Sequence, residues 1–209
     1  MTACLGVILD KESNTQTFFG GGEVENKSKQ VASDKDHHNN DIMCMDVNTS
    51  GGRDKAVTGQ VGKSPSVFIW DTATGEKIAR FKLMKAARAV AAVCISPNGD
   101  YIATADKHND HNVCIFKSSD QSLVFTDKGG PDEIFDLAFS KKDGDVSCWS
   151  GGKKHFAHWS VENMEKKKGV FGGNGEPTSF AALTADDQGR CYAGGANSLI
   201  YVWQGRSCK

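Results

Sequence analysis

The sequence predicts an all-β protein made of about four similar antiparallel sheets. Strand-like apolar segments begin at residues 42, 90, 134 and 178, so successive starts are 48, 44 and 44 residues apart. Each is followed by a polar turn and by a short strand that ends in small residues. A third strand then closes on an aromatic residue, and a repeat of this length indicates stacked β units. The aromatics are Trp70, Phe116, Trp159 and Trp203, spaced 46, 43 and 44 residues apart.

The first full unit shows the pattern most clearly. The segment SVFIWD (66–71) is expected to be a strand of such a sheet. The segment TATG (72–75) fits a hairpin turn with glycine at a positive φ, and a fourth strand follows at KIARFKL. Units of this kind are predicted at 42–84, 90–127, 134–171 and 178–209, the last without its fourth strand, after an N-terminal half unit with a polar loop at 1–41.

These units are expected to be blades of a β-propeller. One four-stranded sheet cannot bury both of its faces, so several sheets must stack on one another. The small residues of each second strand allow neighbouring blades to approach closely, and the aromatic of each third strand packs between them. We expect a complete ring of about seven or eight blades, at the upper end of the roughly four to eight that propellers use. We therefore expect these blades to form part of a larger propeller, completed by a further segment of the same or another chain.

Composition narrows the classes of partner. The net charge of −1 argues against wholesale electrostatic binding to nucleic acid or to a membrane. No apolar run is long enough to span a bilayer, and the N-terminus lacks the features of a signal peptide. The seven cysteines show no CxxC spacing, so we expect reduced thiols in a cytoplasmic protein.

No set of residues predicts catalysis or a cofactor. The histidine-containing segments HHNND and KHNDH are interpreted as polar connections, and His155 and His158 fall on opposite faces of a strand. A metal in a central channel would need several converging ligands, and the first strands supply only Asp46 and Asp136. The glycine-rich segments are interpreted as turns, because none of them opens a helix. We expect a non-enzymatic protein with no cofactor and no metal.

Several segments resemble a known family. Trp70 and Asp71 form a Trp-Asp pair, and the period is similar to that of WD repeats. AVTGQVGKSPSVFIWDTATGE (56–76), GGKKHFAHW (151–159) and LIYVWQG (199–205) resemble successive blades of the echinoderm microtubule-associated protein-like family. The Trp-Asp pair occurs once, and no Gly-His dipeptide, the usual start of a WD repeat, is present.

The resemblance implies a function. It implies a non-enzymatic WD-repeat scaffold that binds tubulin or microtubules through a propeller surface, in the cytoskeleton and as a ciliary or axonemal component. The alternative is a general WD-repeat adaptor that assembles other proteins without touching tubulin. A propeller enzyme with a metal in its channel is the third class considered.

Lysines provide the candidate binding surface. Residues 134–171 carry 7 lysines and 5 acidic residues, a net of +2, and tubulin presents an acidic surface that would attract them. A solvated rim is the competing interpretation, because charge runs are common on exposed surfaces. Successive lysines of a strand also cannot all face one way. The candidate partner-binding residues are Lys153, Lys154, Lys166, Lys167 and Lys168, and the candidate blade-packing aromatics are Trp70, Phe116, Trp159 and Trp203.

Overall fold

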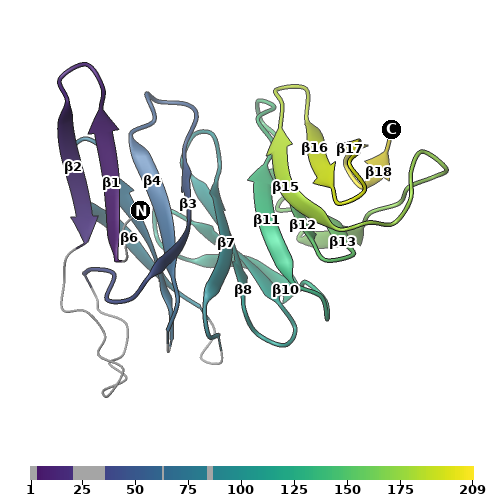
Figure 1. The fold of residues 1–209 in the computed structure, drawn as a ribbon, viewed down its shortest axis with the longest axis horizontal. Helices are drawn as coiled ribbons and strands as arrows, with labels where there is room; N and C mark the ends of the chain where they lie inside the picture. The colour runs from purple at the N-terminus through teal and green to yellow at the C-terminus, as the bar shows by residue number, and fades with distance from the viewer. Residues whose placement is uncertain (1–3, 21–35, 63, 84–86) are drawn as a thin grey trace.

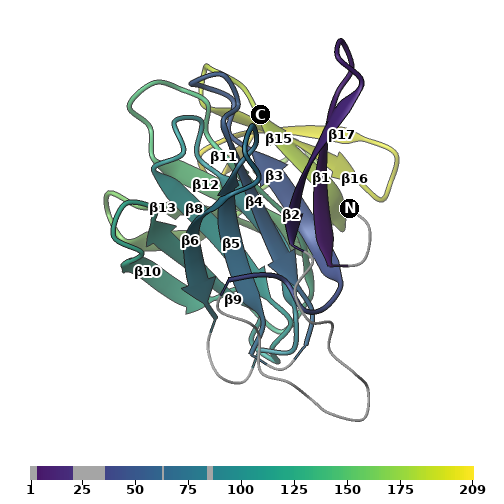
Figure 2. The same cartoon turned by 90° about the vertical axis from the view of Figure 1, so that its left-hand side faces the viewer.

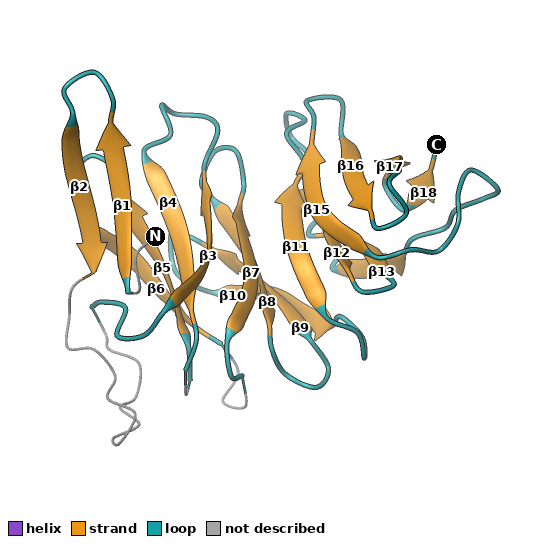
Figure 3. Ribbon diagram, viewed as in Figure 1, coloured by secondary structure: helices purple, strands orange, loops and turns teal. Residues whose placement is uncertain are grey.

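A computed structural model describes residues 4–20, 36–62, 64–83 and 87–209 of the chain. Every regular element in these ranges is a β-strand (Figure 3), which confirms the all-β prediction. The sheets follow one another along an open arc from the N-terminus to the C-terminus (Figure 1). Nothing in the described ranges is a helix that could cross a membrane.

Two four-stranded sheets form the first half of the arc, and we call them blades 1 and 2. In both, neighbouring strands are antiparallel and follow the order of the chain. Blade 1 contains β3 (Ile42–Val47), β4 (Lys55–Gln60), β5 (Ser66–Asp71) and β6 (Lys77–Lys82), and blade 2 contains β7 (Val90–Ile95), β8 (Tyr101–Asp106), β9 (Asn112–Lys117) and β10 (Leu123–Lys128).

Blades 3 and 4 continue the arc, and a two-stranded half-blade precedes blade 1. Turning the molecule brings this half-blade in front of blade 1 (Figure 2). The half-blade contains β1 (Leu5–Asp10) and β2 (Thr15–Gly20), blade 3 contains β11 (Ile134–Phe139), β12 (Ser147–Gly152), β13 (His155–Ser160) and β14 (Glu165–Lys168), and blade 4 contains β15 (Phe180–Ala185), β16 (Arg190–Gly195), β17 (Ile200–Gln204) and β18 (Ser207–Cys208).

Blade 4 differs from the sequence-based expectation at its outer edge. The sequence predicted no fourth strand, whereas β18 pairs with β17 through Trp203–Cys208 and Gln204–Ser207. Gly205 adopts a φ of +53°, which reverses the chain within a two-residue loop. A strand of two residues is too short to produce an apolar alternation, so the sequence pattern did not reveal it.

Each interface between successive sheets has its own apolar cluster, and each cluster contains one of the four repeated aromatics. Each of these aromatics packs against a phenylalanine of the preceding sheet. The ring centroids are 5.3 Å apart for Trp70 and Phe19, 5.2 Å for Phe116 and Phe81, 6.1 Å for Trp159 and Phe125, and 3.9 Å for Trp203 and Phe156.

Cysteines contribute to the same clusters as small apolar side chains. All seven are free thiols. Burial raises the pKa of the Cys44 thiol to about 12 and raises that of Cys148 further still. These two thiols therefore stay protonated at neutral pH and act as packing groups.

Small residues on the second strands allow the sheets to approach closely. A Cβ added to Gly59 would lie 2.5 Å from Val90 Cγ1 of blade 2 and 2.9 Å from Cys44 Sγ. Gly194 occupies the same register position in blade 4, because it pairs with Ala182 as Gly59 pairs with Cys44. Apart from its neighbours in the chain, a Cβ at Gly194 would meet just one atom of the described residues within 4 Å, the Ala182 carbonyl oxygen at 3.9 Å. No further sheet of the described chain covers blade 4.

We therefore expect Gly59→Ala to lower the free energy of unfolding by about 1–3 kcal/mol, because the methyl group overpacks the interface between blades 1 and 2. Gly194→Ala is the matched control and should change stability by less than about 0.5 kcal/mol. Urea unfolding curves of both variants test this. Equal losses in the two variants would contradict the packing role of Gly59.

Candidate functional site

A directed chain of hydrogen bonds ties the aromatic of blade 1 to a buried histidine. Trp70 Nε1 donates to Thr58 Oγ1 at 3.2 Å, and Thr58 Oγ1 lies 2.7 Å from His38 Nε2. His38 Nδ1 lies 2.8 Å from Gln60 Oε1, which can only accept, so Nδ1 carries the proton. Nε2 therefore accepts from the Thr58 hydroxyl. Gln60 Nε2 in turn donates to Asn39 Oδ1 at 2.9 Å.

Blade 3 repeats the chain with different residues. Trp159 Nε1 donates to Ser150 Oγ at 2.8 Å, and Ser150 Oγ lies 2.7 Å from His155 Nε2. Since the hydroxyl accepts from the indole, its own hydrogen is available for Nε2. We therefore assign His155 the tautomer of His38, with the proton on Nδ1. Gly152 pairs with Ile134 at the start of β11, and Gln60 pairs with Ile42 at the start of β3. Gly152 therefore occupies in blade 3 the position that Gln60 occupies in blade 1.

Burial keeps both histidines neutral. It lowers the pKa of His38 to about 4, and the hydrogen bond to Gln60 opposes the shift. Burial likewise lowers the pKa of His155 to about 4, with Lys166 adding to the effect. The sequence suggested only a polar connection at His37 and His38, whereas His38 is fully buried. The signal that could have revealed this burial is Thr58, a hydroxyl residue that pairs with Phe68, two positions before Trp70.

Blade 4 lacks this chain. Ala193 pairs with Tyr201, two residues before Trp203, just as Thr58 pairs with Phe68, two residues before Trp70. Ala193 therefore occupies the position of the hydroxyl, and Trp203 Nε1 is buried without a hydrogen-bond partner in the described chain.

The structure separates the five candidate lysines. Lys153 and Lys154 form the turn between β12 and β13, whereas the other three lie on β14. Lys167 pairs with Glu165 at 2.8 Å. Lys166 instead turns toward blade 2, where its Nζ lies 3.2 Å from Asp127 Oδ2. The run of three lysines thus does not face one way.

Three of these lysines meet at a hollow between blades 2 and 3. The hollow has a volume of about 300 Å³. Lys166 Nζ also lies 5.5 Å from the centroid of the Trp159 ring and donates to the Lys128 carbonyl oxygen. These contacts hold the ammonium group at the side of the hollow. The lining residues with polar or charged side chains are Asp132, Lys154, His155, Lys166 and Lys168.

The two aspartates of the first strands lie in a different hollow, formed by the innermost strands of the four blades. Asp46 accepts from the Ile95 backbone N–H at 3.0 Å, and Asp136 accepts from that of Leu183 at 2.6 Å. Burial raises the pKa of both carboxyls, and their mutual repulsion adds to the shift of Asp136. Each aspartate therefore ties its own blade to the next one. Within the described chain, no group of three or more potential ligands is placed to hold a metal.

A bulge recurs on the innermost strand of every blade. The pairing register shifts at the second residue of β3, β7, β11 and β15. Such a bulge turns a side chain out of the regular ladder. Met43 is 49% exposed and Phe135 is 43% exposed at two of these sites. The bulges thus place apolar side chains on the surface at the inner side of the arc.

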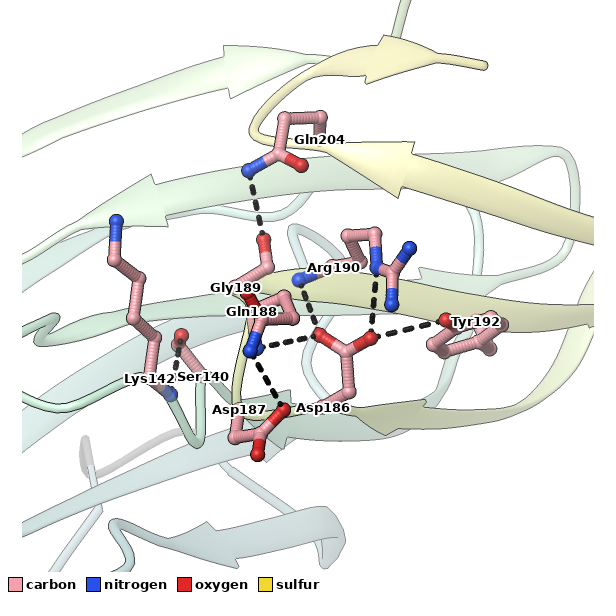
Figure 4. A network of polar contacts seen from close by, with 9 residues as sticks. All are labelled: Ser140, Lys142, Asp186, Asp187, Gln188, Gly189, Arg190, Tyr192 and Gln204. Atoms are coloured by element: carbon pink, nitrogen blue, oxygen red, sulfur yellow. Dashed lines mark hydrogen bonds and ion pairs between the residues drawn. The ribbon is translucent and has the colours of Figure 1, made fainter.

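The opposite ends of the sheets are closed by hydrogen-bonded turns, and Figure 4 shows the β15–β16 turn, where Asp186 accepts from Gln188, Arg190 and Tyr192. Although burial opposes the shift, hydrogen bonds from Arg190, Tyr192 and Gln188 lower the pKa of Asp186 to about 2. The Asp186 carbonyl oxygen also accepts from the Lys141 N–H of blade 3 at 3.3 Å. This turn therefore ties blade 4 to blade 3.

Comparisons with known proteins agree with this architecture. The family model described as "WD domain, G-beta repeat" matches residues 79–117. The solved structures "Structure of U3-55K" and "Crystal structure of RRP9 WD40 repeats" superpose with TM-scores of 0.62 and 0.64 at 22% identity. They cover 78% and 84% of this chain, and 48% and 53% of their own chains. The fold is thus that of an open, partial WD-repeat propeller.

Sequence relatives are more informative. The chain is 48% identical over 208 residues to the ciliary WD repeat-containing protein ctxp80 of Euplotoides octocarinatus, covering 99% of this chain and 29% of the relative. It is 28% identical to echinoderm microtubule-associated protein-like 2 of Rattus norvegicus, covering 79% and 27%. The chain therefore spans less than a third of these relatives. The chain contains a WD repeat at residues 79–117, and its homologues include the echinoderm microtubule-associated protein-like proteins, as the sequence motifs indicated.

The missing acceptor in blade 4 gives a direct test of the hydrogen-bond chain. We expect Ala193→Ser to raise the free energy of unfolding by about 1 kcal/mol, because a hydroxyl at this position can accept from Trp203 Nε1. Chemical denaturation of the variant measures the gain. In the background Trp203→Phe, which has no indole N–H, the same substitution should give no gain. An equal gain in both backgrounds would contradict the assignment.

Proposed function

We propose that this WD-repeat chain belongs to a non-enzymatic scaffold that binds microtubules through a propeller surface in a cilium or axoneme. The observation that carries the proposal is the 48% identity to a ciliary WD repeat-containing protein along nearly the whole chain. The names of the echinoderm microtubule-associated protein-like relatives support the microtubule as the binding partner in this proposal. Their whole-protein properties are extended to this chain as part of the proposal.

The charges of blade 3 supply the physical mechanism. The turn at Lys153 and Lys154 is exposed, and the side chains of these two lysines make no ion pair within the described residues. Exposed cations of this kind accelerate association with an acidic surface and are screened by salt. Binding is therefore expected to be broad, electrostatic and reversible, with localisation to the cytoplasmic cytoskeleton.

A general protein-interaction adaptor is the second candidate. It is favoured by the exposed apolar side chains of Met43 and Phe135 at the inner bulges. Apolar groups on a rigid surface are typical of contacts with other proteins. In that case the chain would assemble partners without contacting tubulin.

Sedimentation with microtubules separates the two candidates. The protein, used as this chain or within a longer natural polypeptide that contains it, should pellet with microtubules at low ionic strength and be released at high ionic strength. Lys153→Glu combined with Lys154→Glu should reduce the bound fraction several-fold, because the exposed turn reverses its charge. Lys141→Glu with Lys142→Glu is the matched control, since that turn lies at the other end of β12. Failure of the unaltered protein to pellet at low salt would favour the adaptor.

A further inference from the structure

The hollow between blades 2 and 3 contains a donor that the fold leaves free. In the tautomer assigned above, the Ser150 hydroxyl donates to His155 Nε2 and the Nδ1 atom carries the proton. No acceptor among the described residues lies within hydrogen-bond distance of this N–H. The unpartnered polar side-chain atoms that are fully buried in the described chain are Ser118 Oγ and Trp203 Nε1. His155 Nδ1 is not one of them, so this atom is in contact with solvent. His155 therefore offers one oriented donor from a side chain that lines the hollow.

Comparison with blade 1 shows why this donor is free. There the corresponding Nδ1–H of His38 is taken by the side chain of Gln60. The residue paired at that place in blade 3 is Gly152, which has no side chain to accept. A Cβ at Gly152 would lie 2.0 Å from the Glu133 carbonyl oxygen, so the close backbone approach requires glycine here. The acceptor for His155 must therefore come from outside this blade.

Positive charge surrounds the same place. The side chains of Lys154 and Lys168 line the hollow and make no ion pair within the described chain. Lys166 is partly neutralised by Asp127, and Asp132 contributes one opposing charge. With Lys166 paired to Asp127, the charges of Lys154, Lys168 and Asp132 leave a net of +1, so an anion is favoured.

We propose that this hollow binds a side-chain carboxylate of an acidic protein segment, held by the His155 Nδ1–H and by Lys154 and Lys168. The proposal rests on the proposed function, because tubulin is the acidic partner in question. A carboxylate fits because one oxygen can accept from the imidazole while the other faces the lysines. The backbone offers no cradle for a phosphate, since the N–H groups of Gly129 and Gly130 already donate to the carbonyls of His111 and Asp110.

A labelled decaglutamate peptide tests the site by fluorescence anisotropy. Lys154→Ala with Lys168→Ala should weaken binding at least about tenfold, because both unpaired charges of the hollow are removed. Lys142→Ala with Lys167→Ala removes the same charge elsewhere on blade 3 and should change the affinity less than about threefold. Equal losses in the two double variants would overturn the site.

Nuclear magnetic resonance provides a readout that does not depend on a variant. The ¹⁵N resonance of His155 Nδ1 should shift on titration with the decaglutamate peptide, because the N–H gains an acceptor. A resonance that stays fixed at saturation would overturn the role of His155. Tighter binding of a phosphoserine peptide of the same length, or of inorganic phosphate, would overturn the carboxylate assignment.

The two proposals fail differently. If the protein binds the peptide in the hollow but does not pellet with microtubules, the site stands and the microtubule function fails. If Lys154→Ala with Lys168→Ala pellets as well as the unaltered protein, the microtubule function stands and the hollow is not its binding site.

Discussion

The structure depends on the burial of each sheet against the next. A four-stranded sheet with apolar residues on both faces is unstable alone, because exposing either face to water costs about 25 cal/mol per Å². In this chain every interface has the same design, with an aromatic of one blade packed on a phenylalanine of the blade before it. The close approach requires glycine at Gly59, where an added Cβ would lie 2.5 Å from the Val90 side chain of the next blade. The arc therefore follows from repetition of one local contact, and stability is expected to be the sum of such nearest-neighbour terms.

In blades 1 and 3 the polar groups inside this apolar stack are satisfied locally, and the way they are satisfied determines where binding can occur. The indole N–H of a buried tryptophan needs an acceptor, and in blades 1 and 3 a hydroxyl and a neutral histidine provide one. In blade 1 the chain ends internally on Gln60 and Asn39. In blade 3 it ends at His155, beside lysines that lack partners. The hydrogen-bond chain is closed by Gln60 in blade 1. In blade 3, where Gly152 takes the place of Gln60, it leaves the His155 N–H free to bind a partner.

Much of the fold could be predicted from the sequence, because the spacing of the repeated apolar segments reports directly on the period of the sheets. The aromatics Trp70, Phe116, Trp159 and Trp203 were found by spacing alone. The two-residue strand β18 was not, because it is too short to carry a pattern. His38 was also missed, since its partners Thr58 and Gln60 are about twenty residues away and only the register brings them together. Likewise, the sequence identified the lysines as a group. Which of them share a hollow depends on the face of the strand from which each side chain projects and on contacts with blade 2, such as the ion pair of Lys166 with Asp127.

Hydrogen exchange resolved to individual strands tests most directly whether stacking of the blades holds the arc together. Strands β8 and β9 are covered by sheets on both sides, whereas β16 and β17 are covered on one side only in the described chain. Amides of β8 and β9 should therefore exchange slowest and at a common rate, and those of β16 and β17 should exchange markedly faster. Equal protection of the two pairs of strands would contradict the account, because stability would then not depend on the neighbouring sheets.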